Sequence, residues 1–383
     1  MVVWFALLGC GTCEKQASEP HTAIPCPDLF DPDRVSEIGL VIAPEHWEAL
    51  LDEYRNWEQR RRDGLEVKPW HPLVSFRMGD ERVLNASIRL KGNPCCSWQA
   101  DKMQFVVAFN QEDRDGRFHG VRKLAFDAPA YDPSVLRERV ALSYFTDAGF
   151  AAACATHASL SINGEVYGTY TQLEFVDDEL LERQFPNEPI GSLYKFDFLS
   201  QRWENQNDDA GLAALNALYE VDDDLAGTVE QFDIEQALHF WAAEAVINQS
   251  DGYWAGSINF FLYDHPERGF QLLPWDLDNA IDYWAARRSP FRRQDYHGHA
   301  GHLDGILADP EWSARFEDAV RDTHRALDPD VLIDRIDRWD AQIRPYLEAE
   351  PHRPFTMAEH DAAVESLRAH LVLRDHYLCG LVD

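Results

Sequence analysis

The chain has 383 residues, of which 67 are Asp or Glu and 35 are Lys or Arg, so its formal net charge is −32. This charge argues against a nucleic-acid-binding protein, because phosphate backbones are gripped by Lys and Arg, and it also disfavours docking on anionic lipid headgroups. Hydrophobic residues make up 45% of the chain, which supports a sizeable core in one large two-lobed domain or in two ordinary domains.

The first residues form a short apolar run that ends in Leu7-Leu8-Gly9-Cys10. This run resembles a bacterial lipobox and predicts a signal segment at 1–9, a lipid on Cys10 and a location in the cell envelope outside the cytoplasm. The start lacks the usual positive charge, so a frayed hydrophobic terminus is the alternative. Residues 10–34 are polar and rich in Pro and predict a tether. Of the seven cysteines, the six that follow Cys10 are compatible with disulfides in that compartment, and their pairing stays open.

A strand-rich region is predicted from residue 35 to residue 175. It holds two hairpin signals, one at Gly79-Asp80 and the stronger one at Asn163-Gly164. Between them, Asp132-Pro133 predicts a helix start, because Asp caps a helix and Pro suits its first turn.

Basic residues surround a glycine-led loop in this region. Gly92 follows a strand that carries Arg89 and Lys91, and Lys102 opens the next strand. A loop of this kind can bring backbone N–H groups against a phosphate. The three cations are therefore candidates for the phosphate side of a site, although a lysine at a strand start is more often simply exposed.

Acidic and amide residues gather around a second hairpin, between residues 240 and 282. An apolar helical segment leads to Asp251, and two strand-like runs, with Asn259 near the start of the first, then lead to Asp276 and Asp278. Carboxylate and amide oxygens are hard ligands that suit Mg²⁺ or Mn²⁺ carrying a phosphate. A metal-free carboxylate beside them can accept a proton from an attacking hydroxyl. The alternative is that these acidic residues are solvated turn residues.

The motifs around these residues resemble the spore-coat CotH family, which has an atypical kinase fold. The resemblance covers roughly residues 35 to 285 and rests on these segments: RLKGN (89–93), DPSVLRERVA (132–141), LSINGEVYGTYTQLE (160–174), DGY (251–253), NFFLY (259–263) and PWDLD (274–278). It implies an α+β, kinase-like two-lobed fold with a strand-rich N-lobe at 35–175 and a mostly helical C-lobe at 176–383.

The resemblance also implies a role for each candidate. Asp251 would be the catalytic base, and Asn259, Asp276 and Asp278 would hold the metal. The nucleotide side would comprise Lys102 as the nucleotide lysine, Arg89 as the second choice, Lys91, Glu138 as the partner of Lys102, and Glu174 at the hinge that meets adenine. The chain departs from ordinary kinases because it has no His-Arg-Asp, has a longer spacing between Asp251 and Asn259, and has Asp-Leu-Asp in place of Asp-Phe-Gly. It departs from the Gly-Asn-Ser loop that is usual in the family, because Pro94-Cys95-Cys96 stands in the glycine-led loop.

The implied activity is phosphoryl transfer from ATP, with Mg or Mn, to Ser or Thr of an extracytoplasmic protein. A non-catalytic surface or coat protein that keeps the fold as a binding module is the main alternative. A metal-dependent phosphoesterase is weaker, because ordered His ligands are lacking near the carboxylates.

Overall fold

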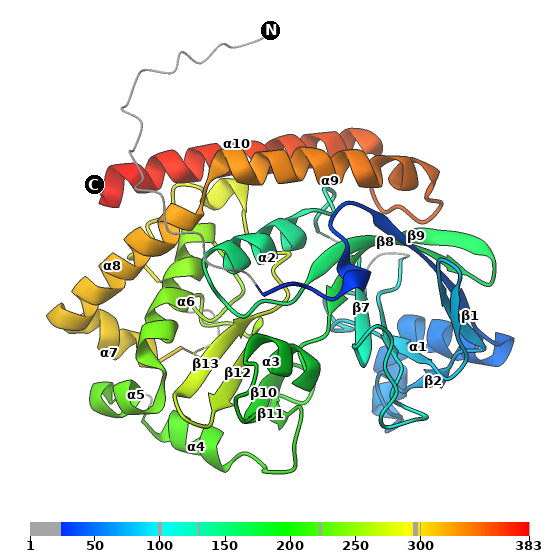
Figure 1. The fold of residues 1–383 in the computed structure, drawn as a ribbon, viewed down its shortest axis with the longest axis horizontal. Coiled ribbons are helices and arrows are strands. Elements are labelled where there is room, and N and C mark those ends of the chain that lie inside the picture. Colours follow the sequence, from blue (N-terminus) through cyan, green and yellow to red (C-terminus); the bar gives the residue numbers. More distant parts are fainter. Residues whose placement is uncertain are drawn as a thin grey trace, which may run out of the picture.

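The computed structural model describes residues 24–98, 102–128, 131–221, 224–293, 298 and 300–382. The segment that contains Cys10 lies outside these residues. The described chain forms two lobes with a pair of long helices along one side (Figure 1). No helix within the described ranges is long and apolar enough to cross a membrane.

The N-lobe is built on a nine-stranded sheet. Its strands are β1 (Val35–Val41), β2 (His71–Pro72), β3 (Ser75–Met78), β4 (Glu81–Val83), β5 (Ser87–Leu90), β6 (Phe105–Ala108), β7 (Lys123–Asp127), β8 (Ala155–Ile162) and β9 (Glu165–Glu174). They lie in the order β2-β5-β6-β7-β9-β8-β1-β3-β4, and β1 and β8 pair in parallel. The helices of this lobe are α1 (Pro44–Arg62) and α2 (Arg137–Asp147).

The hairpin predicted at Asn163-Gly164 joins β8 to β9. Both residues have positive φ angles, 53° and 91°, as the two central residues of a tight hairpin turn require. The Asn163 side chain also accepts a hydrogen bond from the backbone N–H of Ile42, 2.8 Å away, which holds the turn against the end of β1.

The helix predicted to start at Asp132 begins five residues later, at Arg137. Asp132 still organises the start, because its carboxylate accepts hydrogen bonds from the backbone N–H groups of Ser134 and Arg137, each 3.0 Å away. Val135 between them has a φ of 57°, which interrupts the helical geometry. The capped turn places Glu138 in the first turn of α2, facing the centre of the molecule.

The C-lobe combines a four-stranded sheet with most of the helices. Its strands are β10 (Ser192–Asp197), β11 (Arg202–Asn205), β12 (Phe260–His265) and β13 (Gly269–Pro274), in the order β11-β10-β12-β13. Its helices are α3 (Asp178–Gln184), α4 (Ala213–Glu220), α5 (Leu225–Gln231), α6 (Ile234–Ile247), α7 (His302–Ala308), α8 (Pro310–Ala326), α9 (Pro329–Ala349) and α10 (Met357–Val382). The α+β fold class, with a strand-rich first lobe and a mostly helical second lobe, is confirmed.

Helices α9 and α10 pack against each other and run along the top of the view in Figure 1. Contacts between α9 and β9 bring the end of α9 to the N-lobe sheet. The C-terminal helices therefore contact both lobes.

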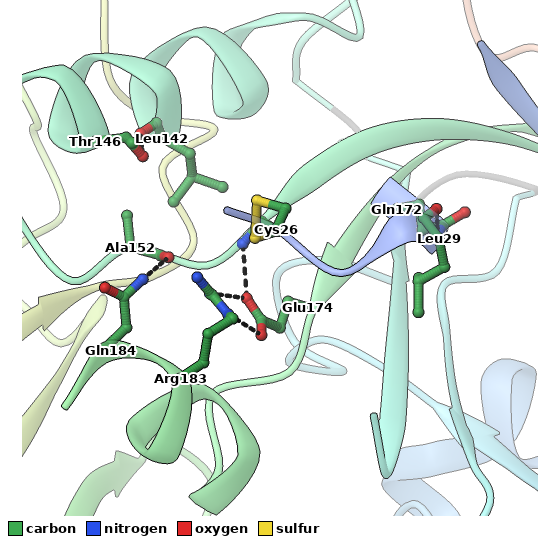
Figure 2. Close-up of a disulfide and its surroundings, with 10 residues drawn as sticks. Cys26, Leu29, Leu142, Thr146, Ala152, Gln172, Glu174, Arg183 and Gln184 are labelled. Atoms are coloured by element: carbon green, nitrogen blue, oxygen red, sulfur yellow. Dashed lines mark hydrogen bonds and ion pairs between the residues drawn. A yellow bond between two sulfur atoms is a disulfide. The ribbon is translucent and has the colours of Figure 1, made fainter. Parts of the chain in front are cut away.

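The segment 24–34, expected to be part of a tether, belongs to the fold. Leu29 and Phe30 are buried in the N-lobe core, and Cys26 forms a disulfide with Cys154 at the start of β8, with Cα atoms 5.8 Å apart (Figure 2). Polar composition suggested a tether, but a short apolar pair and a long-range disulfide are sufficient to anchor a segment of this length.

Removing the Cys26–Cys154 disulfide should lower the free energy of unfolding by about 2–5 kcal/mol, because the bond closes a loop between residues 128 positions apart and so restricts the unfolded chain. Chemical denaturation of a Cys26→Ser/Cys154→Ser variant measures the change. The matched control is Cys95→Ser/Cys96→Ser, because those two cysteines are bonded to each other at adjacent positions and close no long loop. Equal unfolding free energies for the Cys26→Ser/Cys154→Ser variant and the unmodified protein would contradict this account.

Candidate active site

A cavity of about 540 Å³ is lined by residues of both lobes. It collects six of the nine residues singled out from the sequence: Arg89, Lys91, Asp251, Asn259, Asp276 and Asp278. Lys102, Glu138 and Glu174 are not among the described residues that line it.

The loop that carries Asp251 is held by the buried carboxylate of Glu244 on α6. This carboxylate accepts hydrogen bonds from the backbone N–H groups of Tyr253 and Trp254, 3.2 and 2.6 Å away. Burial raises the pKa of Glu244 to about 8, against the lowering effect of these two donors. A Cβ on Gly252 would lie 2.1 Å from Glu244 Oε1, so glycine is required after Asp251. The glycine of the Asp251-Gly252 pair is thus explained by the close approach of its backbone to the Glu244 carboxylate.

Asp251 is fixed by side chains from both ends of the hairpin. Its carboxylate accepts hydrogen bonds from Ser257 Oγ at 2.5 Å, Asn259 Nδ2 at 2.8 Å and Asn279 Nδ2 at 3.4 Å. The backbone N–H of Asn259 also donates to the carbonyl of Asp251, 3.1 Å away. The structure therefore joins the carboxylate and the amide that the sequence separates by eight positions.

Asp276 follows β13 directly and contacts Lys91 of the N-lobe. Its backbone has a φ of 59°, a conformation that non-glycine residues rarely adopt and that turns the chain sharply at the end of the strand. Lys91 Nζ lies 3.3 Å from Asp276 Oδ1 and 2.6 Å from Asp127 Oδ2. Burial alone would raise the pKa of Asp276, but the cations Lys91 and Lys195 outweigh it and hold that pKa below its usual value.

Asp127 is a site residue that the sequence analysis missed. Leu90 pairs with Phe105 and Phe105 with Phe126, so Lys91 and Asp127, each one position further along, lie in one row across three strands. Burial lowers the pKa of Lys91, and the charges of Asp127 and Asp276 reverse this and raise it. The sequence did show an aspartate at the end of the apolar strand at 123–127. It could not show that Lys91 is its partner, because that depends on the sheet register.

Asp127, Glu138 and Asp276 form a compact carboxylate cluster. One oxygen from each lies within 4.8 Å of the others. Burial, followed by the negative charge of Asp127, raises the pKa of Glu138 well above its ordinary value. Burial also raises the pKa of Asp127, and the pKa of Asp278 is raised well above the ordinary value by burial and by Asp276. Full ionisation of these carboxyl groups is thus unfavourable in their buried surroundings.

The position of Lys102 does not fit its expected role as the nucleotide lysine. Its ammonium group is buried, lies 2.7 Å from Glu350 Oε1 at the end of α9, and donates to the carbonyl of Thr169, 2.5 Å away. The expected pair of Lys102 with Glu138 is replaced by that of Lys91 with Asp127. Sequence position alone could not reveal this exchange, because the partner of Lys102 comes from a helix almost 250 residues further along the chain.

The side chain of Glu174 also has a structural contact. It accepts hydrogen bonds from Arg183 on α3, 2.5 Å from Oε2, and from the backbone N–H of Cys154, as Figure 2 shows. Phe175, the next residue, lines the cavity. Glu174 thus fixes the end of β9, and a contact between adenine and the backbone of this segment stays a prediction.

Four cationic side chains of the described residues line the cavity: Lys68, Arg89, Lys91 and Lys195. Lys68 and Lys195 were not identified from the sequence. Burial lowers the pKa of Lys195 to about 8, and its ammonium group lies over the ring of Phe261, 4.7 Å from the centroid. Arg89 lies over the ring of Trp70, 4.9 Å from its centroid, and its Nε has no hydrogen-bond partner in the described part of the chain. The cavity thus brings four cations together with the carboxylates that line it, in a protein whose net charge is −32.

The glycine-led loop reaches the same cavity through Gly92, Asn93, Cys96 and Ser97. Gly92 has a φ of 86°, and a Cβ there would lie 2.9 Å from the Cβ of Ser97. The loop therefore closes tightly on itself beside Lys91, despite the Pro94-Cys95-Cys96 departure. It is a candidate for contact between backbone N–H groups and an anion.

Comparisons with known proteins give a family model, a relative and a solved structure to which this chain is similar. A family model described as CotH kinase protein matches residues 88–378. Inner spore coat protein H of Bacillus subtilis (strain 168) is 20% identical over 346 residues, which cover 80% of this chain and 90% of that protein. A chain from the solved complex of the Shewanella oneidensis MR-1 toxin–antitoxin system HipA and HipB with operator DNA is 14% identical, with a TM-score of 0.35, and the match covers 86% of this chain and 72% of that one.

Proposed function

The chain belongs to the CotH kinase family, and on this premise we propose that it transfers a phosphoryl group from ATP, bound with Mg²⁺ or Mn²⁺, to a Ser or Thr hydroxyl of a protein outside the cytoplasm. The observation that carries the proposal is the single cavity in which Asp251, Asn259 and Asp276 face the cations of the N-lobe. Reactions of this class depend on positioning and on charge neutralisation, and both require these groups to converge.

The residues of the cavity fit a divalent metal. Asn259, Asp276 and Asp278 offer only oxygen ligands, the type that Mg²⁺ and Mn²⁺ prefer. Burial, and then the negative charge of neighbouring carboxylates, raises the pKa of Glu138 and of Asp278. A divalent cation would offset that negative charge. When bound, the metal would neutralise the phosphate oxygens and orient them. Asp276, Asn259 and Asp278 would hold it.

The N-lobe cations fit the phosphates of the nucleotide. Asp127 fixes Lys91 on one side, so its ammonium group keeps a defined position while its contact with Asp276 can be exchanged for a phosphate oxygen. Arg89, and Lys195 from β10 of the C-lobe, line the same cavity and add positive charge, and Gly92 provides the close backbone approach. Lys91, held by Asp127, is therefore our nucleotide lysine.

Asp251 fits the role of general base. Three donors orient its carboxylate, and it lines the same cavity as Asp276. In the proposed reaction the acceptor hydroxyl oxygen forms a bond to phosphorus as its proton passes to Asp251. The bond between phosphorus and the bridging oxygen breaks, and ADP leaves with that electron pair.

A thermal-shift titration of the full chain with ATP tests the proposal, with Mg²⁺ or Mn²⁺ present and then with chelator. We expect a metal-dependent rise in Tm, because a ligand that binds only the folded state stabilises it. The full chain is needed because Cys26 is bonded to Cys154. A wild-type protein that does not respond to ATP with either metal would contradict the kinase and favour the binding module.

Lys91→Met should abolish the ATP-dependent rise in Tm, because it removes the cation that Asp127 presents to the cavity. Lys102→Met is the matched comparison. It leaves Glu350 buried without its cation and should lower the free energy of unfolding by about 3–5 kcal/mol while ATP still raises Tm. The reverse pattern, with ATP binding lost in Lys102→Met and kept in Lys91→Met, would restore the assignment made from the sequence.

We also propose that the protein lies in the cell envelope, with a lipid on Cys10. The disulfide between Cys26 and Cys154 supports an oxidising compartment, where such bonds persist. Cys10→Ser should release the protein from the membrane fraction, since each buried CH₂ of a lipid contributes about 0.8 kcal/mol. Fractionation of cells that express the variant measures this, and an unchanged membrane fraction would refute the anchor.

A further inference from the structure

A second group of metal-binding side chains lies far from the cavity in sequence and comes from the ends of two helices. His324 is in the last turn of α8, and Asp375 and Cys379 are on α10. The spacing of four residues places Asp375 and Cys379 on the same face of α10. One ligand atom from each of the three residues lies within 4.8 Å of the others.

The three side chains form a cluster in which His324 is buried and the other two are partly exposed. The imidazole of His324 is 3% exposed, and its Nε2 lies 2.9 Å from Asp375 Oδ1, which is 23% exposed as a side chain. Cys379 is half-buried, and neither of the two described disulfides includes it. The arrangement therefore offers an oriented imidazole nitrogen, a carboxylate oxygen and a thiol.

These ligand types point to zinc. Imidazole, thiolate and carboxylate bind Zn²⁺ at about 2.0–2.3 Å in tetrahedral geometry. Mg²⁺ and Ca²⁺ prefer oxygen alone, so the sulfur distinguishes this group from the carboxylates of the cavity. Separations below 4.8 Å can close to zinc-binding distances by side-chain rotation.

We propose that His324, Asp375 and Cys379 bind a Zn²⁺ ion that joins the end of α8 to the end of α10, with water as the fourth ligand. The ion would also fix Arg374, the neighbour of Asp375. Arg374 donates hydrogen bonds to the carbonyls of Val246 and Ala245, each 2.7 Å away, at the end of the helix that leads to Asp251. Zinc would thus stabilise the helix that supports the catalytic loop.

Titration of the full chain with Co²⁺, a spectroscopic substitute for Zn²⁺, tests the proposal, and a Zn²⁺ titration by thermal shift accompanies it. We expect a thiolate-to-cobalt charge-transfer band and a Zn²⁺-dependent rise in Tm of a few degrees. Cys379→Ser should remove the band, whereas Asp276→Asn should keep it. A Cys13→Ser variant should also keep it, which excludes Cys13 as the source. A band that is absent from wild type, persists in Cys379→Ser, or disappears in Cys13→Ser would overturn the site.

Asp375→Asn provides a second test that does not depend on a buried substitution. It removes a charged ligand at the accessible rim and should weaken Zn²⁺ binding by at least 10-fold, measured by competition with a chromophoric chelator. Equal affinity in Asp375→Asn and wild type would show that His324 and Asp375 form only an ion pair, and the proposal would fail.

Discussion

Asp276→Ala is expected to abolish metal-dependent nucleotide binding and phosphoryl transfer together. Asp276 lines the cavity with Asn259 and Asp278, the other two proposed metal ligands, and contacts Lys91 of the N-lobe. Its pKa is lowered by Lys91 and Lys195 despite burial, so it is ionised at neutral pH and able to bind a cation. Loss of the side chain removes a metal ligand and the contact that aligns the lysine.

The measurement is the Tm of wild type and variant with ATP and Mg²⁺ or Mn²⁺, followed by transfer of labelled phosphate. Circular dichroism should show that Asp276→Ala folds, because Lys91 keeps Asp127 as its partner. Asp209→Ala, an exposed acidic position elsewhere on the C-lobe, is the matched control for charge. A folded Asp276→Ala variant whose Tm rises with ATP and metal as in wild type would remove Asp276 from the metal site.

Much of the site could be predicted because its C-lobe half is local in sequence. Asp251, Asn259 and Asp276 lie within 26 residues. They flank one hairpin, so turn and strand signals alone bring them together. The Asn163-Gly164 hairpin was predictable for the same reason. In each case the pattern in a short window determines the local structure.

The N-lobe half could not be predicted in this way because it depends on sheet register and on distant partners. Lys91 and Lys102 both lie next to strands in the sequence. Only the pairing register of β5, β6 and β7 shows that Asp127 lies beside Lys91. Lys102 instead forms an ion pair with Glu350 at the end of α9, outside the cavity. Lys195 was missed because its strand, β10, pairs with β12 of the hairpin, and the paired residues are about 70 positions apart in the sequence.

Those long-range contacts also explain why the N-terminal segment was misassigned. Composition described residues 24–34 correctly as polar, but Leu29 and Phe30 are buried in the N-lobe core and Cys26 is bonded to Cys154, 128 positions away. A short segment with few apolar residues can be fixed by a distant partner of this kind. No short window of the sequence contains both the segment and its partner.

Asp251→Asn is expected to leave nucleotide binding nearly intact and to reduce phosphoryl transfer by roughly 10²–10⁴-fold, the usual contribution of a general base. The substitution keeps size and one acceptor oxygen but removes the basic carboxylate. The Ser257 hydroxyl can rotate to accept from the new amide, and Asn259 can keep donating to the remaining oxygen. The variant should therefore keep the loop geometry that Glu244 and Gly252 impose.

Ser257→Ala is the matched control for this substitution, because it removes one hydrogen bond to Asp251 and leaves the carboxylate in place. It should slow transfer far less than Asp251→Asn does. The informative measurement is the rate of transfer at saturating ATP together with the ATP-dependent change in Tm. If Asp251 is the base, Asp251→Asn separates the two readouts, whereas Asp276→Ala lowers both. Equal rates for wild type and Asp251→Asn would assign proton acceptance to another group or to water, and a loss of ATP binding would place Asp251 among the metal ligands.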